Sequence, residues 1–438
     1  MLVALLALLL PGLAFPVLVS AKGNRAGTWT KAPNLLNQRI AHAATLLPDG
    51  RVLVTGGWNV AGDATATAEL FDPKINRWLP AASMSTVRAA HTATLLSDGT
   101  VLVAGGEAAN NTFPNGVTAT AEIYHPSSNR WTPAASMHFP RSRHSAVRLH
   151  DGRVLLVGGF IEPSGGDAMP ELALEQAELY DPKGNSWRAA GDGLSFVSDQ
   201  ALTLLSTGQA LVTGGASDGV SATSQAEFFD PATNRWRPTT WPMATPRYGH
   251  TATLLANGMV FLTGGYTTSQ TVGGAGDVLP TRQFLNTSEI FDLRGNSLVR
   301  VAYSDIPRFE HTATLLDNGA VLVVGSAYAS NADSQLFDPA NTENWISTGV
   351  PMDRYLHTAT RLVDGRVLIA GGYGVGSANT AWLFSAQSVV SSTSYSPSTG
   401  LLIAAFVALA LVAGMILVAT RRPQRRAARE TDSEWIGP

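Results

Sequence analysis

The sequence predicts an all-β fold, a seven-bladed β-propeller, and three observations carry this prediction. A phrase of the type Arg-x-x-His-Thr-Ala-Thr-Leu-Leu, then Asp-Gly, then Val-Leu-Val-x-Gly-Gly, recurs seven times with variations. From His42 to His357 there are 315 residues in six steps, a mean period of about 52. Each copy is built from short β-type runs separated by turn residues. A period of that size made of short strands is typical of a radial β array rather than a two-layer domain.

The repeats are counted by the position that opens the first strand of each copy. It is filled by His42, His91, His144, Gln200, His250, His311 and His357.

Each copy is expected to form four strands, a to d, running outward from the axis. Strand a is the His-Thr-Ala-Thr-Leu-Leu run, and the Asp-Gly or Asn-Gly pair after it supplies the positive φ angles of a tight hairpin. Strand b is apolar throughout, as expected for burial between two neighbouring blades. Strand c, of the Ala-Glu-Leu-Phe-Asp type, ends at a proline, which cannot donate to the ladder. Strand d carries a tryptophan that can fill the gap between blades.

The two ends of the repeat array complement each other. The last copy, from His357 to Phe384, has strands a to c and lacks a strand d. The segment Thr28 to Pro33 has the sequence Thr-Trp-Thr-Lys-Ala-Pro, which matches the strand-d sequence of Arg130 to Pro133. We therefore predict that the first strand completes the last blade. Such closure removes the exposed sheet edges that favour aggregation.

These motifs resemble the Kelch-repeat family, whose marks are a Gly doublet, then a Tyr or Phe, then a Trp. Gly105-Gly106, Tyr124 and Trp131 show the full set, and five other copies show most of it. The resemblance covers Thr28 to Phe384. The repeat sequence is similar to that of galactose-oxidase-like propellers of the bacterial type. It implies a closed seven-bladed Kelch propeller. Galactose oxidase itself builds a copper-radical site with a Tyr–Cys crosslink, and this chain has no cysteine, so that chemistry is not expected.

The N-terminus resembles a secretory signal. Residues 2–19 are apolar apart from two prolines, and Val19-Ser20-Ala21 offers small side chains to a signal peptidase. We expect a signal peptide at 1–21, with an uncleaved membrane anchor as the alternative.

The C-terminus predicts a membrane anchor. Residues 401–420 carry no charge and would span about 30 Å as a helix, and five arginines follow in the tail at 421–438. Positive charge stays cytoplasmic, so the tail is expected inside and the propeller, residues 22–384, outside. Residues 385–400, rich in Ser and Thr, are expected to form a flexible stalk. The predicted location is therefore the cell membrane, with a single pass.

Composition excludes several classes of function. Charged residues make up 14% of the chain and the net charge is -3, so nucleic acid is not an expected partner. The lack of cysteine excludes disulfides, thiolate metal sites and a cysteine nucleophile. No phosphate loop or serine elbow stands out. We therefore predict no cofactor, no metal and no catalytic residue, and leave enzymatic activity open.

Loop lengths point to one functional face. The a–b turns are uniformly tight, whereas the b–c loops vary greatly between copies, which is typical of the binding face. The Arg-x-x-His motif enters strand a beside the axis, and its inner positions break the symmetry. They suggest a saccharide platform of rings, carboxylates and Arg donors. The predicted ligand-binding residues are Asp199, Arg247, Tyr248, Arg308, Phe309, Glu310, Arg354 and Tyr355.

A structural alternative exists for the same residues. Each His could hydrogen-bond to a neighbouring blade, each Arg could pack over a turn, and the aromatic rings could pack between blades. Six histidines around a wide channel also lack the close spacing of a metal site.

The sequence thus favours a membrane-anchored, extracytoplasmic binding module for a glycan or a protein ligand. A carbohydrate-active enzyme with its site on the variable face is the main alternative, and a scaffold for other membrane proteins is a third. A polar, concave pocket with two carboxylates would favour the enzyme, and a shallow aromatic surface would favour binding.

Overall fold

A computed structural model describes residues 27–387, except for gaps at 109–115, 162–171, 174–175, 192–197, 217–220, 241, 273–277, 295–296, 327–332, 341–344, 352, 375 and 377. The chain divides into two compact units, Met1–Gln387 and Ser388–Pro438, and all described residues belong to the first. The predicted signal peptide, transmembrane helix and tail, and nearly all of the stalk, lie outside the described residues. Within the described part no helix is long and apolar enough to cross a membrane.

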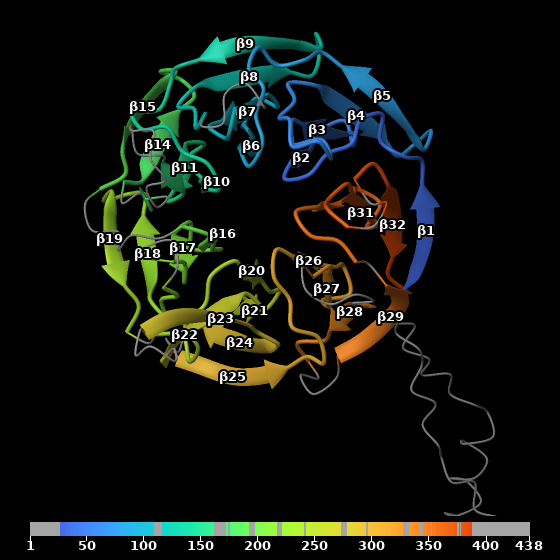
Figure 1. Cartoon of the computed structure of the whole chain (residues 1–438). Coiled ribbons are helices and arrows are strands. Elements are labelled where there is room, and N and C mark those ends of the chain that lie inside the picture. Colours follow the sequence, from blue (N-terminus) through green and yellow to red (C-terminus); the bar gives the residue numbers. More distant parts are fainter. Residues whose placement is uncertain are drawn as a thin grey trace, which may run out of the picture. The chain divides into compact units, whose positions relative to one another are not determined.

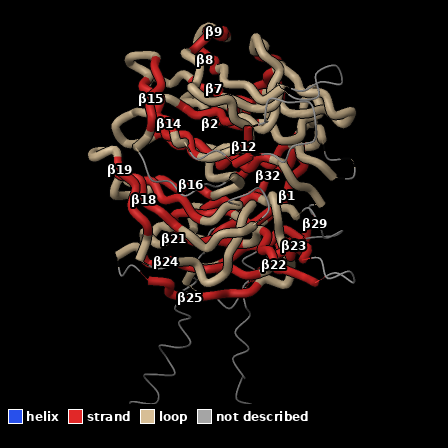
Figure 2. Tube along the Cα trace, turned by 60° about the vertical axis from the view of Figure 1, so that its left-hand side comes forward, coloured by secondary structure: helices blue, strands red, loops and turns tan. Residues whose placement is uncertain are grey.

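The described unit is a seven-bladed β-propeller, as predicted. Seven antiparallel sheets of four strands stand around an axis, each with its first strand innermost (Figure 1). Figure 2 shows only strands and loops among the described segments. The first three blades are formed by β2 (Ala43–Leu46), β3 (Val52–Thr55), β4 (Ala68–Asp72) and β5 (Arg77–Ala81); β6 (Thr92–Leu95), β7 (Val101–Ala104), β8 (Ala121–His125) and β9 (Arg130–Ala134); and β10 (Ser145–Arg148), β11 (Val154–Val157), β14 (Glu178–Asp181) and β15 (Ser186–Ala189).

The remaining blades follow the same plan, and two b–c loops add small hairpins of their own. Blades 4 to 6 are formed by β16 (Ala201–Leu204), β17 (Ala210–Thr213), β18 (Ala226–Asp230) and β19 (Arg235–Pro238); β20 (Thr251–Leu254), β21 (Val260–Thr263), β24 (Thr287–Asp292) and β25 (Ser297–Tyr303); and β26 (Thr312–Leu315), β27 (Val321–Val324), β28 (Asp333–Phe337) and β29 (Trp345–Pro351). The added hairpins are β12 (Phe160–Ile161) with β13 (Leu172–Ala173) in blade 3, and β22 (Tyr266–Val272) with β23 (Val278–Phe284) in blade 5.

The N-terminal strand closes the ring. Strand β1 (Thr28–Ala32) is the outermost strand of blade 7 and pairs with β32 (Ala381–Ser385). Strands β31 (Val367–Ala370) and β30 (Thr358–Arg361) follow toward the axis. Trp29 lies opposite Phe384 in this pairing, and their ring centroids are 4.9 Å apart. The Trp29 indole N–H also donates to Thr348 Oγ1 of blade 6 at 2.9 Å. The predicted closure is confirmed, and it ties the two ends of the propeller to each other.

The hydrophobic core lies between blades rather than within them. All four residues of strand b are buried in every blade, as the apolar sequence of this strand predicts. One cluster joins Leu53 and Leu70 of blade 1 to Val103 and Tyr124 of blade 2. Because a single blade cannot cover both of its apolar faces, each blade needs a neighbour on either side.

The strand-d tryptophans link successive blades by hydrogen bonds. The indole N–H of Trp131 donates to the carbonyl oxygen of Ala82 in the preceding blade at 2.7 Å, and Trp187 donates to Ala135 in the same way. Each of these rings also packs on the strand-c aromatic of its own blade, as Trp131 does on Tyr124 at 5.0 Å. These tryptophans therefore fill the space between blades, as expected.

The a–b turns differ from the prediction in one detail. Only the Gly of each Asp-Gly pair has a positive φ, 89° at Gly50 and 83° at Gly99. The preceding carboxylate instead accepts a backbone hydrogen bond, as Asp49 Oδ1 does from the N–H of Arg51 at 3.0 Å. The turn is thus held by an aspartate side chain and one left-handed Gly, not by two left-handed residues.

Candidate functional site

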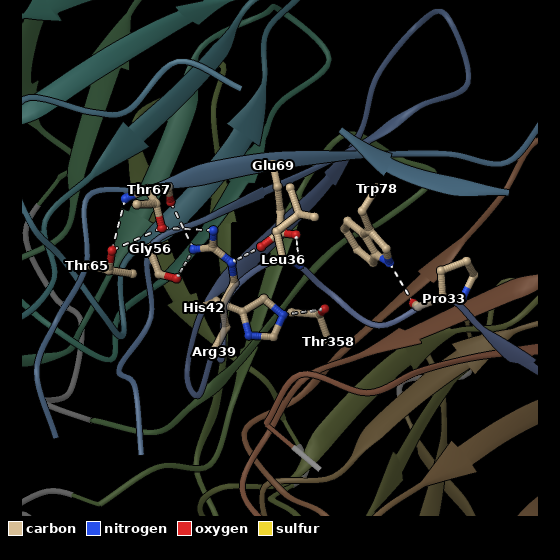
Figure 3. A network of polar contacts seen from close by, with 10 residues as sticks. All are labelled: Pro33, Leu36, Arg39, His42, Gly56, Thr65, Thr67, Glu69, Trp78 and Thr358. Atoms are coloured by element: carbon tan, nitrogen blue, oxygen red, sulfur yellow. Dashed lines mark hydrogen bonds and ion pairs between the residues drawn. The ribbon is translucent and has the colours of Figure 1, made fainter. Parts of the chain in front are cut away.

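The arginine of the Arg-x-x-His motif is an internal tie of its blade. In blade 1, Arg39 Nε donates to Glu69 Oε1 at 2.7 Å, and its Nη1 donates to the carbonyl oxygens of Gly56 and Thr67 (Figure 3). The side chains of Arg39 and Glu69 are both 0% exposed. The guanidinium group therefore joins the end of strand b, the start of strand c and the loop that enters strand a.

Four blades share the complete ion pair, and three do not. The pairs are Arg39–Glu69, Arg88–Glu122, Arg141–Glu178 and Arg247–Glu289, with N–O distances of 2.6 to 2.9 Å. In blade 6, Arg308 donates instead to Gln335 Oε1 at 2.9 Å, and in blade 7 Arg354 donates to backbone oxygens and Thr380 Oγ1. Burial lowers the pKa of Arg308 and Arg354 to about 10.

Three of the predicted ligand-binding residues are such arginines. Arg247, Arg308 and Arg354 are 0%, 1% and 5% exposed, and their guanidinium groups lie inside their blades. A ligand could reach them only if the blade opened. The placement agrees with the structural alternative of an arginine packed within the repeat.

The histidines of the motif bond to the preceding blade. The Nε2 of His42 lies 2.9 Å from Thr358 Oγ1 of blade 7 (Figure 3), and the Nε2 of His91 lies 2.9 Å from Thr55 Oγ1 of blade 1. Gln200 keeps the same role in blade 4 by donating to the carbonyl oxygen of Val157 at 2.6 Å. Burial lowers the pKa of His42 to about 3, so the imidazole is neutral near pH 7. The structural alternative for the histidines is therefore confirmed.

The residue just before each of these positions has a left-handed backbone. We call these seven residues the hub positions, and each contributes to one ring around the axis. They are Ala41 (φ 51°), Ala90 (50°), Arg143 (53°), Asp199 (51°), Gly249 (63°), Glu310 (48°) and Leu356 (54°).

Hydrogen bonds between blades explain this unusual backbone. The N–H of Ala90 donates to the carbonyl oxygen of Ala41 at 2.8 Å, and the N–H of Arg143 donates to Ala90 at 2.9 Å. Equivalent bonds run from Gly249 to Asp199 and from Ala41 to Leu356. A left-handed conformation costs a non-glycine residue roughly 1 to 2 kcal/mol, so the ring of bonds must hold it in place.

The hub positions line a cavity of ≈ 330 Å³ at the axis. All seven contribute to its wall, together with the motif histidines, Gln200, Ser145 and Trp58. Because the hub positions end the d–a loops and Trp58 begins a b–c loop, the cavity opens on the face where loop lengths vary. The predicted functional face therefore does carry a concave site.

The charges in this cavity are unevenly distributed. Arg143, Asp199 and Glu310 come from blades 3, 4 and 6, and Gly249 of blade 5 leaves no side chain between the two carboxylates. Burial and, to a smaller extent, the charge of Asp199 raise the pKa of Glu310 to about 7, against the opposing effect of Arg143. Arg143 Nε lies 3.6 Å from Glu107 Oε1.

Aromatic rings surround the Glu310 side of the cavity. The ring of Phe309 lies 3.9 Å from that of Tyr266, which lies 5.2 Å from Tyr248. A Cβ atom added to Gly249 would meet Phe309 Cε2 at 2.5 Å, so the Phe309 ring covers this hub position. On the other side, Tyr355 lies 5.2 Å from Tyr373.

The predicted aromatic residues have different environments. Tyr248 is 3% exposed and belongs to a buried cluster with Tyr266 and Ala216, which fits packing between loops. Phe309 and Tyr355 are half-buried and stay accessible beside the cavity. Asp199 and Glu310 are the two predicted residues that line the cavity itself.

The sequence prediction missed Arg143, Trp58, Tyr266 and Tyr373. The last three directly follow a Gly pair, and each forms an isolated β-bridge with the residue after the motif arginine. The sequence does contain a signal for these three residues. The residue after the Gly pair changes from copy to copy, while the glycines before it repeat. Comparing the copies column by column, rather than one motif at a time, would have found it.

Comparison with known proteins fits this architecture. The family model for the Kelch motif matches residues 39–85 and 88–138. Blades 1 and 2 therefore contain Kelch motifs, and we use the term Kelch propeller for the described seven-bladed unit. Kelch-like protein 35 of Mus musculus is 39% identical over 94 residues, which is 21% of this chain and 15% of that relative. The Kelch propeller thus matches a small part of the relative's length.

Two solved structures share the fold. A fungal alcohol oxidase of the AA5 family, in complex with copper, superposes with a TM-score of 0.59 at 19% identity, covering 82% of the Kelch propeller chain and 76% of the oxidase. The structure of YjhT superposes with a TM-score of 0.53 at 16% identity, covering 72% of this chain and 99% of YjhT. At these identities the likeness concerns the fold.

The residues of this Kelch propeller do not fit a copper site. The chain has no cysteine for a Tyr–Cys crosslink, and the Nε2 atoms of the motif histidines face threonine hydroxyls of the preceding blades. Among the described residues no group of three His, Cys, Asp or Glu side chains could hold a metal ion. We therefore derive no chemistry through copper.

Proposed function

We propose that this Kelch propeller is an extracytoplasmic binding module, anchored in the cell membrane by residues 401–420, whose hub cavity recognises a saccharide. One observation carries the proposal: the seven geometrically equivalent hub positions hold six residue types, while the motif arginine and histidine on either side recur in six of the seven copies. The fold needs a left-handed residue there, and Gly or Asn would serve best. Arg143, Asp199 and Glu310 are not required by the repeat, so their chemistry points to a ligand.

The cavity offers the contacts that saccharides use. Trp58 lines the cavity and presents apolar surface for the C–H face of a pyranose, and the half-buried Phe309 ring lies next to Glu310. Asp199 and Glu310 supply oxygen acceptors for ring hydroxyls, and Arg143 supplies donors. Because a charge-assisted hydrogen bond is roughly twice as strong as a neutral one, these three side chains would fix the orientation of the sugar.

The last strand of the propeller ends on the face opposite the mouth of the cavity. Strand β32 ends at Ser385 on the face of the tight a–b turns, opposite the face on which the cavity opens. The polypeptide therefore leaves the propeller away from the site. A module tethered for recognition at a cell surface needs such access.

A glycan array tests the proposal with the purified full chain and two matched variants. Asp199→Asn removes a carboxylate from the cavity, and Asp364→Asn removes one from an a–b turn on the opposite face. We expect the wild type and Asp364→Asn to bind the same glycans, and Asp199→Asn to lose at least about 10-fold in affinity, or 1.4 kcal/mol. Absence of any glycan binding, or equal loss in both variants, would contradict it. Since Kelch domains generally mediate protein–protein interactions, a protein ligand is then the remaining reading.

One observation favours a second function, a carbohydrate-active enzyme. Two carboxylates share one cavity, and the pKa of Glu310 is raised to about 7 by burial and by Asp199. Glycoside hydrolases pair a protonated carboxylic acid with an ionised carboxylate in this way. Glu310 would donate the proton to the glycosidic oxygen, and Asp199 would act as the base or the nucleophile.

The two functions separate by turnover. Each glycan that binds is incubated with the wild type and with Glu310→Gln, and reducing ends are measured. Release by the wild type that disappears in the variant, with binding retained, supports the enzyme. Unchanged glycans after prolonged incubation leave recognition without chemistry.

A further inference from the structure

We propose that the hub cavity selects a saccharide that carries a free, protonated amino group, an amino sugar rather than a neutral or N-acetylated one. This inference rests on the proposed function and names the ligand class of the same site. Two independent features carry it: the balance of charged side chains in the cavity wall, and the aromatic rings around Glu310.

The charged side chains of the wall favour a cation. Asp199 and Glu310 both line the cavity, and Arg143 is the single Arg or Lys among its described lining residues. The motif histidines add no charge, because burial lowers their pKa far below 7. Arg143 in turn has Glu107 Oε1 at 3.6 Å from its Nε. When Glu310 is ionised, the site thus contains more negative than positive charge.

The aromatic rings favour a cation as well. The charge of Glu310 contributes to raising the pKa of both Tyr266 and Tyr355, which lie on either side of this carboxylate. The Phe309 ring packs on Tyr266 with a centroid distance of 3.9 Å. The faces of aromatic rings attract ammonium groups because the ring quadrupole places negative charge on the face. A carboxylate between aromatic rings is therefore suited to an ammonium group.

The hub position of blade 5 adds no charged or polar side chain between the two carboxylates. Gly249 stands between the hub positions of Asp199 and Glu310 and has no side chain. The Phe309 ring covers Gly249, where an added Cβ would come within 2.5 Å of Cε2. An ammonium group that enters the cavity would therefore face Asp199 and Glu310 with no hub side chain between them. The cavity volume of ≈ 330 Å³ is sufficient for a small ligand of this kind.

A matched set of ligands tests the inference on the unmodified full chain. The probes are tetramers of β-1,4-linked glucosamine, of N-acetylglucosamine and of glucose, which share a backbone and differ in the 2-substituent. Calorimetry is carried out at pH 6.5, where much of the amine is protonated. Because the pKa of Glu310 is about 7, part of Glu310 is ionised at this pH, and a bound ammonium group favours its ionised form. We expect the glucosamine tetramer to bind at least about 10-fold more tightly than the other two, because opposite charges attract more strongly at a partly buried site than in bulk water.

Variants assign the preference to the carboxylates. Glu310→Gln and Asp199→Asn should each reduce the preference for the amine, whereas Arg143→Gln should leave it equal or larger because it removes a positive charge. Thermal melting confirms that each variant is folded. Because the wild-type comparison needs no substitution, a variant that fails to fold does not affect the main test.

Each outcome decides a different point. Equal or tighter binding of the neutral tetramers overturns the inference and leaves the proposed saccharide function standing. Failure of all three tetramers, together with a blank glycan array, overturns both. Binding of tetralysine without binding of the glucosamine tetramer assigns the cation site to a peptide ligand and also overturns the inference.

Discussion

Blades 1, 2, 3 and 5 differ from blades 4, 6 and 7 at the buried pair formed by the motif arginine and the strand-c glutamate. In the first group the motif arginine is neutralised by a strand-c glutamate, as in Arg39–Glu69. In blade 4 a valine replaces the arginine, in blade 6 Gln335 replaces the glutamate, and in blade 7 Trp382 takes its place. The buried Arg–Glu pair of the repeat is thus complete in four blades and altered in the other three.

Two of the three blades without the complete ion pair also supply the acidic groups of the hub. Asp199 comes from blade 4 and Glu310 from blade 6, whereas blades 1 and 2 place Ala41 and Ala90 at the same positions. The fold tolerates an incomplete ion pair because backbone oxygens still accept hydrogen bonds from the arginine. The carbonyl oxygen of Gly325, for example, accepts from Arg308 Nη1 at 2.8 Å. The comparison teaches that blade geometry depends on backbone acceptors first, and that the ion pair is added stabilisation.

The largest effect is expected from breaking a complete pair. Glu69→Ala leaves Arg39 buried without its carboxylate and removes the acceptor of the Leu36 N–H, which donates to Glu69 Oε2 at 2.7 Å. Loss of one partner of a buried pair costs about 3 to 5 kcal/mol. Urea unfolding of the purified chain measures it. Gln335→Ala, at the matching site of blade 6, is the control and should cost less than half as much.

Closure of blade 7 gives the next effect. Trp29→Ala removes the packing of the indole on Phe384 and its hydrogen bond to Thr348. Truncation of a packed Trp costs about 3 kcal/mol, and here it also frees the strand that closes the ring. We expect a lower melting temperature and earlier proteolysis near residue 30. Trp131→Ala, in a blade formed by consecutive strands, should lower the melting temperature but leave residue 30 protected.

The pH dependence of stability follows from Glu310. Its pKa is raised to about 7 in the folded chain by burial and by Asp199, with Arg143 opposing, and Tyr266 and Tyr355 also face it. A carboxyl group with a raised folded pKa favours the folded state below its unfolded pKa and loses that contribution as pH rises through about 7. Glu310→Gln should therefore be more stable than the wild type at pH 8, by about 3 kcal/mol, and equal at pH 4. Guanidinium unfolding at the two pH values measures the difference, and an equal gain at both would contradict the assignment.

The smallest expected effect restores the complete pair where it is missing. Gln335→Glu would place a carboxylate beside Arg308 Nη2, which already donates to Gln335 Oε1 at 2.9 Å. We expect a gain of about 1 kcal/mol, since a charge-assisted hydrogen bond replaces a neutral one and burial of the new charge offsets part of it. A shift of the urea midpoint to higher concentration checks this. A lower midpoint would show that blade 6 has adapted to the glutamine.

The number of blades and the closing strand were determined by the sequence alone. The repeat period, the apolar strand b and the match between Thr28–Pro33 and strand d are local patterns, and a closed ring is the arrangement that buries every blade face. The buried arginines were less certain, since a motif that repeats fits both a ligand ring and a structural tie.

The site itself was decided only by the tertiary structure. Asp199 and Glu310 are far apart in the sequence, and the ring alone brings their side chains into one cavity. Arg143 and Leu356 adopt a left-handed backbone that their residue types disfavour, because hydrogen bonds between neighbouring blades impose it. Repetition along the chain thus specifies the blades, whereas the chemistry at the axis depends on contacts between blades that no local pattern records.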